Sequence, residues 1–393
     1  MFNFKQYDWR RYNFTILVVM VILCICSAYF VSFAIAATEG EDRAGSYFKR
    51  QIISMFVSLI IAVIISLIDY KRICDFVIIY YIIATILVAA TKLSPLGTDL
   101  KTGSYRWLNI YGLKLQPSEI CKLVVIMALA VFFVKMQDSM ASAKTFFKGF
   151  LIMFVPTFFI LIQSDLSSSL VMFFVFAMVV FAAGLSYKIV APVLGVTIPT
   201  VLGALWFVQQ PIARKLIPDK HWYQVERIIS FMNPEKYKNS LMYQQFHSIQ
   251  SIASGRLTGK LLSDSAGSGR NYGWVDVCES DFIFTVIGEE VGFIGCCLII
   301  ALLCVIIFMC IRTAIRCNET LGYLIAVGIS AMFMFQVFAN IGVASMILPN
   351  TGLPLPFLSN GISSMVSCSI AIGIILNIGI QSGTGDRSGI SFL

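Results

Sequence analysis

Charged residues are scarce in this chain of 393 residues. Aspartate, glutamate, lysine and arginine together make up 13% of it, whereas hydrophobic residues make up 58%. The mean hydropathy of +0.84 also lies far above that of soluble domains. The composition therefore excludes a soluble protein and predicts one that crosses a membrane several times.

Histidine is rarer still, and the two histidines, His221 and His247, lack the spacing of a metal site. Of eleven cysteines, ten fall in or beside apolar runs and only Cys278 lies in a long loop. This distribution excludes a disulfide framework, and the chain has no paired CxxC pattern for zinc. We expect the cysteines to serve mainly as small apolar side chains.

Apolar runs long enough to cross a membrane dominate the rest of the chain. A transmembrane helix needs roughly 17 to 25 apolar residues, and about ten such runs lie near residues 12–36, 50–68, 73–91, 118–134, 147–162, 170–185, 189–208, 282–311, 321–348 and 364–380. Internal repeats and low-complexity tracts are absent from the sequence. We predict an all-α polytopic membrane protein with about ten transmembrane helices, forming a single membrane domain over residues 1–393.

Two connections between these runs are large, at about 94–118 and at 209–281, the second between helices 7 and 8. The segment "YQQFHSIQSIASG", residues 243–255, has the apolar spacing of a helix that lies on or near the membrane surface. Loops longer than about 15 residues are usually functional or disordered. The aromatic residues and periodic segments of the second loop favour function.

The distribution of lysine and arginine predicts the orientation, because cationic loops resist translocation. Both termini are expected in the cytoplasm, and both large loops outside. The cytoplasmic side then carries Lys5, Arg10, Arg11, Lys71, Arg72, Lys135, Lys144, Lys148, Lys188, Arg312, Arg316 and Arg387. The formal net charge of +8 is explained by this topology. No basic and aromatic platform for nucleic acid is present, so we expect no nucleic-acid partner.

Ionisable side chains inside or beside the apolar runs form a short list. Each costs on the order of 2.5 to 3.5 kcal/mol on insertion scales, so such groups usually face a polar interior and a partner. They are Arg50, Glu119, Lys122, Asp165, Glu289 and Glu290. The i, i+3 spacing of Glu119 and Lys122 lets them pair on one helix face. Either these groups only hold helices together, or they line a polar cavity open to the outside, which six of them favour.

The first outer loop places Arg106 beside Trp107, with Lys114 following. Trp107 is explained either as an anchor at the membrane interface or as a stacking platform for a sugar or lipid head. In the second case Arg106 would bind a phosphate, for which a guanidinium is well shaped.

Asp281 stands at the start of the long apolar run that contains Glu289 and Glu290, eight and nine residues later. It is explained either as the N-cap of a helix or as a functional acid at the outer water boundary. A position at a helix N-terminus would favour the ionised carboxylate. Further on, "TGLPLPFLSNGISS", residues 351–364, indicates a broken, re-entrant connection, tolerated at membrane depth only where it is buried in protein or lines a cavity.

Six ordered blocks resemble those of the shape, elongation, division and sporulation family of bacterial membrane proteins, the group of RodA, FtsW and SpoVE. The blocks are "GSYRWLNIYGLKLQPSEICKL", "QSDL", "ERIISFMNPEKYKNSLMYQQ", "SGRLTGK", "ESDFIFTVIGEEVGFIG" and "FQVFANIGVASMILPNTGLPLPFLSNGISS". They extend over nearly the whole chain, and the length and number of spans also agree with the family.

The resemblance implies a peptidoglycan glycosyltransferase of the bacterial cytoplasmic membrane, acting in cell elongation, division or sporulation. Such an enzyme joins the disaccharide of lipid II to a growing glycan chain, and undecaprenyl pyrophosphate leaves. It implies that Asp281 is catalytic, either as the acid-base residue or as the residue that positions a divalent cation, Mg²⁺ or Mn²⁺. A class B penicillin-binding protein and other elongation or division proteins are the implied partners. The implied substrate-binding residues are Arg106, Trp107, Lys114, Gln116, Glu119, Lys122, Asp165 and Ser359, with Arg50, Glu279 and Glu289 as accessory residues.

The chain departs from the family pattern in places. Asp276 to Ser280 replace most of a Pro-Glu-x-His-Thr stretch while Asp281 is kept, and Glu279 stands where the family has histidine. Elsewhere Ser164 replaces a proline, Arg256 a glycine, Asn360 a tyrosine and Ile362 a glycine. These departures leave two alternatives open: a flippase or transporter of lipid-linked precursors, for which we find no repeats, and a catalytically weak scaffold for cell-wall synthesis.

The orientation is directly testable. In a variant without native thiols, a cysteine placed within residues 209–281 is expected to react with a membrane-impermeant maleimide added from outside the cell, because the lysine and arginine asymmetry requires that loop to be external. Labelling from the cytoplasmic side only would contradict the topology.

Overall fold

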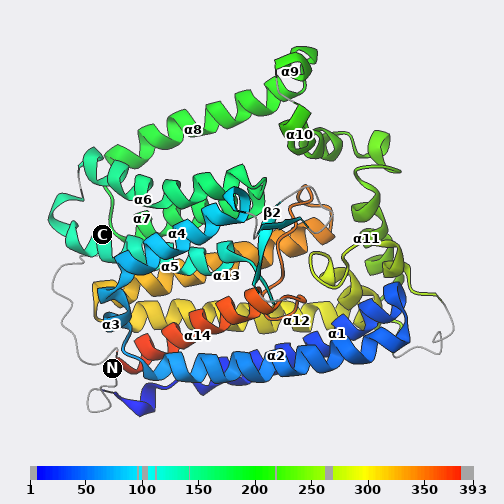
Figure 1. Ribbon diagram of the computed structural model, residues 1–393, viewed down its shortest axis with the longest axis horizontal. Coiled ribbons are helices and arrows are strands. Elements are labelled where there is room, and N and C mark those ends of the chain that lie inside the picture. The colour runs from blue at the N-terminus through cyan, green and yellow to red at the C-terminus, as the bar shows by residue number, and fades with distance from the viewer. Residues whose placement is uncertain are drawn as a thin grey trace.

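The computed structural model describes residues 7–94, 97–99, 105–110, 113–140, 142–216, 219–261 and 269–381. The long helices form a bundle, and both ends of the described chain lie at the same end of it (Figure 1). There the Asp8 amide donates a hydrogen bond to the Ile380 carbonyl at 3.0 Å. We call this the terminal end, and we call the opposite end, with the small sheet and the longest connections, the loop end.

The described part of the chain contains ten apolar helices of 17 residues or more, as predicted. They are α1 (Phe14–Glu39), α2 (Glu41–Leu67), α4 (Val77–Leu93), α5 (Pro117–Lys135), α6 (Ala143–Ile162), α7 (Leu166–Ala182), α8 (Tyr187–Val208), α12 (Ile283–Arg316), α13 (Thr320–Ala344) and α14 (Ile362–Gln381). Eight are long and apolar enough to cross a membrane, whereas α4 and α7 have 17 residues each. This confirms the all-α polytopic membrane fold.

Two features differ from the sequence prediction. The second span begins at Glu41 rather than near residue 50, so that only Gly40 separates α1 from α2. Glu41 and Asp42 stabilise the first turn of α2 because acidic side chains suit the positive end of the helix dipole. Helix α8 stands apart from the rest of the bundle and leads into α9 (Pro211–Leu216) (Figure 1).

The loop end contains a three-stranded antiparallel sheet of β1 (Gly97–Asp99), β2 (Tyr105–Ile110) and β3 (Leu113–Leu115), in that order. Trp107 of β2 pairs with Thr98, and Leu108 pairs with Leu115. Pro117 then opens α5 in its first turn, where proline is well tolerated. The sheet therefore places Arg106 and Trp107 beside the start of α5.

The remaining short helices are α3 (Tyr70–Asp75), α10 (Asp219–Met232) and α11 (Tyr243–Ser254), with 3-10 turns at Trp9–Arg11, Gln137–Ser139, Pro234–Tyr237 and Asn271–Trp274. The predicted helix near 243–255 is confirmed as α11, but its buried face is polar. Gln245 donates to the carbonyls of Val343 and Leu348 at 2.9 and 2.8 Å, and the Ser248 hydroxyl lies 2.5 Å from that of Thr285. Helix α11 therefore packs on α12 and α13 through hydrogen bonds.

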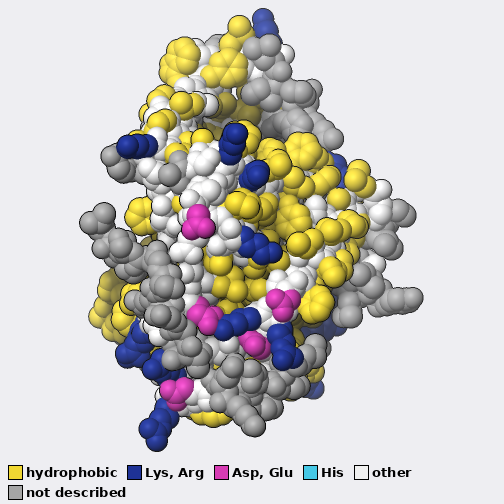
Figure 2. Space-filling model, turned by 90° about the vertical axis from the view of Figure 1, so that its left-hand side faces the viewer, with side chains coloured by type: hydrophobic (Ala, Val, Ile, Leu, Met, Phe, Trp, Pro, Cys, Tyr) yellow, Lys and Arg dark blue, Asp and Glu magenta, His cyan; other side chains and the backbone are white. Residues whose placement is uncertain are grey.

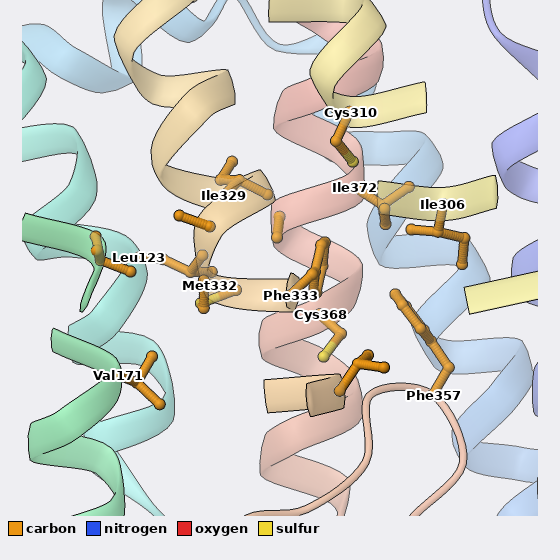
Figure 3. Close-up of a cluster of buried hydrophobic side chains, with 14 of the residues drawn as sticks. Leu123, Val171, Ile306, Cys310, Ile329, Met332, Phe333, Phe357, Cys368 and Ile372 are labelled. Atoms are coloured by element: carbon orange, nitrogen blue, oxygen red, sulfur yellow. The ribbon is translucent and has the colours of Figure 1, made fainter. Parts of the chain in front are cut away.

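Most of the buried apolar side chains belong to one continuous cluster. Figure 3 shows its centre, where Leu123 of α5 and Val171 of α7 approach Met332 and Phe333 of α13. Phe357, from the segment before α14, closes the cluster towards the loop end, and its ring centroid lies 5.5 Å from that of Phe333. The irregular segment between α13 and α14 is thus part of the core.

This segment, residues 345–361, contains most of the predicted connection at 351–364, whose last three residues instead begin α14. Leu353, Leu355, Phe357 and Leu358 are all at most 2% exposed. Its carbonyls find partners within the protein, since Ser27 donates to Leu358 at 2.6 Å. The irregular backbone is therefore buried and hydrogen-bonded, as required in an apolar medium.

Helix α12 is interrupted at Gly292, where φ is 63° and ψ is −165°. The segment 256–261 supplies the backbone hydrogen bonds that the helix loses. Lys260 and Leu261 donate to the carbonyls of Glu289 and Glu290 at 2.9 Å each, and the amide of Phe293 donates to Arg256 at 2.9 Å. The outer loop is thereby joined to α12 by main-chain bonds.

Gly259 is required at this junction for two reasons. Its φ is +82°, and a Cβ there would lie 2.1 Å from the Glu290 carbonyl oxygen. Gly184 is a matched control, because its φ is +80° with nothing within 4 Å of a Cβ. We expect Gly184→Ala to cost about 1–2 kcal/mol from backbone strain alone, and Gly259→Ala a further 1–3 kcal/mol or so from overpacking. Thermal unfolding in detergent measures both, and equal losses would contradict the junction.

Candidate functional site

Asp281 lies at the loop end, immediately before α12. Its carboxylate accepts a hydrogen bond from the Ser280 hydroxyl at 3.2 Å. A Cβ on Gly352 would lie 3.0 Å from Oδ2, so the segment before α14 passes directly beside this carboxylate. The N-cap of α12 is Phe282, and no side chain caps the helix. The interpretation of Asp281 as a helix cap is therefore wrong, and its carboxylate is left for another role.

The environment of Asp281 does not favour ionisation as its helix-entry position predicted. Burial raises the pKa of the Asp281 carboxyl above its ordinary value, and Asp165 adds to the rise. The Ser280 hydrogen bond and the charges of Arg106 and Arg227 oppose it. The net raised pKa suits a group that takes up a proton during a reaction.

Arg106 extends from β2 towards Asp165, and its charge also acts on the Asp281 carboxyl. Its Nη2 donates to the Ser164 carbonyl at 2.7 Å, and its Nη1 lies 3.8 Å from Asp165 Oδ1. Its Nε is buried and has no hydrogen-bond partner among the described residues. Arg106 is therefore held in place, and its Nε–H can still donate a hydrogen bond.

Asp165 has a structural role that the sequence analysis did not identify. It caps α7, since its Oδ1 accepts from the Ser168 amide at 3.1 Å and its Oδ2 accepts from the Ser168 hydroxyl at 2.8 Å. Its side chain is only 2% exposed. The structure assigns it to holding Arg106 and the start of α7.

Glu119 and Lys122 form the predicted pair, with Lys122 Nζ 2.8 Å from Glu119 Oε1 and both side chains buried. The pair faces α14, where the Ser367 hydroxyl donates to the Glu119 carbonyl at 2.8 Å. The prediction that Arg50 shares this interior is wrong, because Arg50 is exposed and lies over the Tyr47 ring at 5.7 Å. Arg50 lies in the third turn of α2, on the exposed side of that helix.

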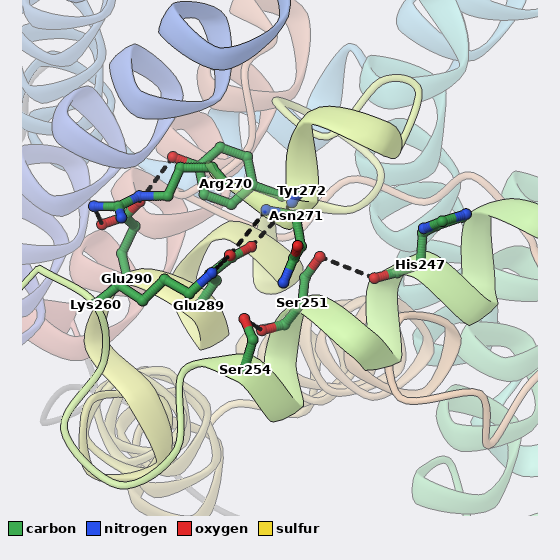
Figure 4. Close-up of polar contacts among 9 residues, drawn as sticks. All are labelled: His247, Ser251, Ser254, Lys260, Arg270, Asn271, Tyr272, Glu289 and Glu290. Atoms are coloured by element: carbon green, nitrogen blue, oxygen red, sulfur yellow. Dashed lines mark hydrogen bonds and ion pairs between the residues drawn. The ribbon is translucent and has the colours of Figure 1, made fainter. Parts of the chain in front are cut away.

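Glu289 is also separate from that pair. It binds Lys260 and accepts from the amides of Asn271 and Tyr272 at 2.9 Å each. Glu290 pairs with Arg270 at 2.7 Å and accepts from the Tyr272 hydroxyl at 2.7 Å (Figure 4). Both glutamates therefore anchor the outer loop to α12, and the accessory role predicted for Glu289 is corrected to a structural one.

The other predicted residues lie at the loop end. Ser359 is buried and links two segments, since its hydroxyl donates to the Ser280 carbonyl at 2.6 Å and accepts from the Leu355 amide at 2.7 Å. The Gln116 amide donates to the Ser363 hydroxyl at 3.0 Å. Trp107 is half-buried in β2. The side chain of Lys114 lies outside the described part of the chain.

Glu279 lies two residues before Asp281. Burial raises the pKa of the Glu279 carboxyl, and the neighbouring Asp281 charge adds to this rise. Its carbonyl accepts from the Asn360 amide at 2.9 Å. Glu279 and Asp281 are therefore two acids in one segment; the backbone of Glu279 is bound by the connection before α14, and that of Asp281 by Asn340 of α13.

Residues that the sequence reasoning did not single out complete the site. Arg227 of α10 donates to the Asn350 carbonyl at 3.1 Å and, with Gln244, Asp276 and Asn350, lines a polar cavity of ≈ 280 Å³. Arg227 and Asn350 both fall in blocks that matched the family pattern, which was the available signal. Their meeting depends on α10 folding back over the loop end.

The described side chains provide few ligands for a permanently bound metal ion. Within the described residues, no group of three or more histidine, cysteine, aspartate and glutamate side chains is arranged to hold a metal. Mg²⁺, however, is often bound by one or two carboxylates together with substrate phosphates. Asp281 could supply one carboxylate to that second arrangement, and the charge of Arg106 acts on it.

Comparison with known proteins agrees with this geometry. Residues 10–383 match the FtsW, RodA and SpoVE family of cell cycle proteins. The chain is 29% identical over 379 residues to a probable peptidoglycan glycosyltransferase FtsW of Trichlorobacter lovleyi, covering 95% of this chain and 94% of that one. It is 29% identical over 376 residues to the peptidoglycan glycosyltransferase MrdB of Escherichia coli, covering 95% of each. It is 28% identical over 367 residues to stage V sporulation protein E of Bacillus subtilis, covering 92% and 96%.

Solved structures share the fold. One, from work on the coordination of polymerization and crosslinking by a peptidoglycan synthase complex, has a TM-score of 0.74 at 23% identity and covers 96% of this chain and 99% of that one. The rod shape determining protein RodA of Thermus thermophilus has a TM-score of 0.63 at 21% identity, covering 96% and 98%.

Proposed function

Because the chain belongs to the FtsW, RodA and SpoVE family of cell cycle proteins, we propose that it is a peptidoglycan glycosyltransferase that polymerises glycan strands from lipid II. The observation that carries the proposal is the setting of Asp281 at the loop end: its carboxyl has a raised pKa, does not cap α12, and is acted on by the charges of Arg106 and Arg227. Named relatives with this activity extend over nearly the whole chain.

In the proposed reaction Asp281 acts as the general base. It takes the proton from an acceptor sugar hydroxyl, whose oxygen then forms a bond to the anomeric carbon of the second lipid-linked sugar. The bond from that carbon to the pyrophosphate oxygen breaks, and undecaprenyl pyrophosphate leaves with the electron pair. A carboxyl with a raised pKa is a stronger base than an exposed aspartate, which favours this transfer.

The leaving pyrophosphate requires positive charge. Arg106 is the best placed to supply it, because its guanidinium keeps a buried Nε without a partner among the described residues and lies near Asp281. Lys122 is already neutralised by Glu119 and fully buried, so we propose that it positions α5 against α14. The half-buried Trp107 is then suited to stacking on a sugar or lipid head.

The polar cavity of ≈ 280 Å³ is the proposed place for an acceptor sugar. Its lining residues Arg227, Gln244, Asp276 and Asn350 offer both donors and acceptors, as sugar hydroxyls require. Arg227 connects this cavity with Asp281, since its charge opposes the rise in the pKa of that carboxyl.

As the alternative to the role of base, we propose that Asp281 would be the protein ligand of a divalent cation, Mg²⁺ or Mn²⁺. When bound, such an ion would neutralise the charge of the leaving group. If polymerisation by the purified protein is unchanged in EDTA, this part of the proposal is wrong and the role of Asp281 as a base remains.

The location, orientation and partner of the protein are also part of the proposal. We propose the bacterial cytoplasmic membrane, with the terminal end in the cytoplasm and the loop end outside, because the described lysines and arginines of the predicted inner side lie at the ends of helices facing the terminal end. The relative determined within a peptidoglycan synthase complex supports a class B penicillin-binding protein as partner. A flippase or a scaffold would not need a base at Asp281.

Asp281→Asn separates these functions. It keeps the size of the side chain and removes the charge, so we expect lipid II polymerisation by the purified protein to fall about 10²- to 10⁴-fold. Glu279→Gln is the matched control in the same segment. Full activity in Asp281→Asn would overturn the assignment, and full activity there with loss in Glu279→Gln would transfer it to Glu279.

The raised pKa of Asp281 also predicts that Asp281→Asn changes how the unfolding temperature depends on pH. Because burial raises the folded-state pKa of Asp281, its contribution to stability is present at low pH and is lost as the pH rises through that pKa. Asp281→Asn lacks this loss, so at pH 7 it is expected to unfold at the same or a higher temperature than the wild type, with the difference shrinking as the pH falls. A variant that is less stable at pH 7 would indicate a structural role.

Gly352→Ala tests the position of the carboxylate without changing it. The new Cβ would lie 3.0 Å from Asp281 Oδ2, at a φ of +73°. Displacing a reacting group by about 1 Å can cost about 10²-fold in rate, so we expect a loss of that order in polymerisation. Gly361→Ala, whose Cβ would meet only Ser364 at 3.8 Å, should remain active. Equal activity of the two variants would contradict the geometry.

A further inference from the structure

A second cavity, of ≈ 590 Å³, lies at the terminal end, far along α12 from Asp281. It is formed where the start of α1, the last turns of α12 and Gly379 of α14 meet. Figure 2 looks at this end of the molecule and shows several lysine and arginine side chains on its surface. The volume falls within the range of about 300–1,000 Å³ typical of small-ligand sites.

Four arginines line this cavity: Arg10, Arg11, Arg312 and Arg316. Arg11 pairs with Asp8 at 3.1 Å. For Arg10, Arg312 and Arg316, no ion pair with an acidic side chain occurs among the described residues. The cavity therefore concentrates positive charge that the described part of the protein leaves largely uncompensated.

Two ordinary explanations account for only part of this cluster. Arg312 and Arg316 lie in the last turns of α12, where basic side chains suit the negative end of the helix dipole, but Arg10 and Arg11 precede α1. Basic residues on the cytoplasmic side also follow from topology, yet Lys135, Lys144 and Lys148 serve that purpose without lining this cavity. Convergence of four arginines from two segments on one cavity requires a further reason.

We propose that this cavity binds the phosphate headgroup of an anionic phospholipid from the surrounding membrane. Basic pockets between transmembrane helices on the cytoplasmic side suit such headgroups, and a guanidinium can donate two parallel hydrogen bonds to a phosphate. Asn13 and Asn318 add uncharged polar side chains to the lining. Asn13 precedes α1 but makes no capping hydrogen bond with its side chain.

Exposed apolar side chains beside the cavity favour a lipid over a soluble anion. On α12, Phe308, Ile311 and Ile315 are 60%, 38% and 63% exposed, and they lie next to the cavity-lining Met309, Arg312 and Arg316. On α1, Phe14 and Val18 are 67% and 57% exposed, next to Thr15 of the lining. A lipid with its phosphate among the arginines would lay its acyl chains along these two packed helices.

The test is lipid binding to the purified full chain, measured by native mass spectrometry with phosphatidylglycerol, cardiolipin or phosphatidylcholine. We expect preference for the two anionic lipids. In Arg312→Gln/Arg316→Gln that preference should weaken about 20- to 30-fold, since each basic residue contributes roughly a fivefold factor near an anionic headgroup. Arg10→Gln/Arg11→Gln is a second, independent pair for the same cavity and should weaken it as well.

Lys144→Gln/Lys148→Gln is the matched control, because both lysines are exposed on α6 and neither lines the cavity. It should bind lipids as the wild type does, and an equal loss there would show a non-specific charge effect and overturn the proposal. Displacement by millimolar inorganic phosphate would identify a site for free anions instead. Tighter binding of a soluble glutamate decapeptide than of anionic lipid would identify a protein-docking site, and it too would contradict the proposal.

Discussion

The side-chain amide of Asn340 is the contact on which the loop end depends. Its Nδ2 donates to the Asp281 carbonyl at 2.9 Å and to the Leu353 carbonyl at 2.7 Å. One residue of α13 thus fixes both the segment before α12 and the segment before α14. Because buried carbonyls need hydrogen-bond partners, Asn340 fixes the backbone at Asp281 by satisfying it there. Ser359 likewise joins the two segments, because its hydroxyl binds the Ser280 carbonyl, one residue before Asp281, and the Leu355 amide.

The acidic side chains discussed above differ in whether they already form an ion pair. Glu119, Glu289 and Glu290 each form an ion pair inside the protein, and Asp165 faces Arg106 while it caps α7. Asp281 makes no ion pair within 4 Å among the described residues. The charges of Arg106 and Arg227 act on its carboxyl only at longer range. The arrangement stabilises the buried charges that support the fold and leaves one carboxyl whose proton affinity is raised.

Much of the fold was predictable from the sequence because apolar length determines which segments cross a membrane. The ten helices and both large connections were found in this way. The partners of the buried charges could not be predicted. The cost of inserting Glu289 into a membrane indicates that it needs a cation, but it does not identify Lys260, 29 residues earlier, as that cation. Arg50 was misplaced for the same reason: proximity to an apolar run does not say which way a side chain points. The cap of α7 by Asp165 was visible in "SDLSSS", whereas the entry of Arg227 required the fold of the outer loop.

The departures from the family pattern have local physical consequences. Ser164, in place of the family's proline, has φ of 62°, a conformation closed to proline, whose ring fixes φ near −65°. Its carbonyl accepts from Arg106, so this substitution and the placement of the arginine belong together. Arg256 has φ of 51° where the family has glycine, and its carbonyl still accepts from Phe293 at the break in α12. Asn360, in place of tyrosine, donates its amide to Glu279, a bond through the main chain that either side chain permits. At these three positions the substituted residues form main-chain hydrogen bonds with Arg106, Phe293 and Glu279.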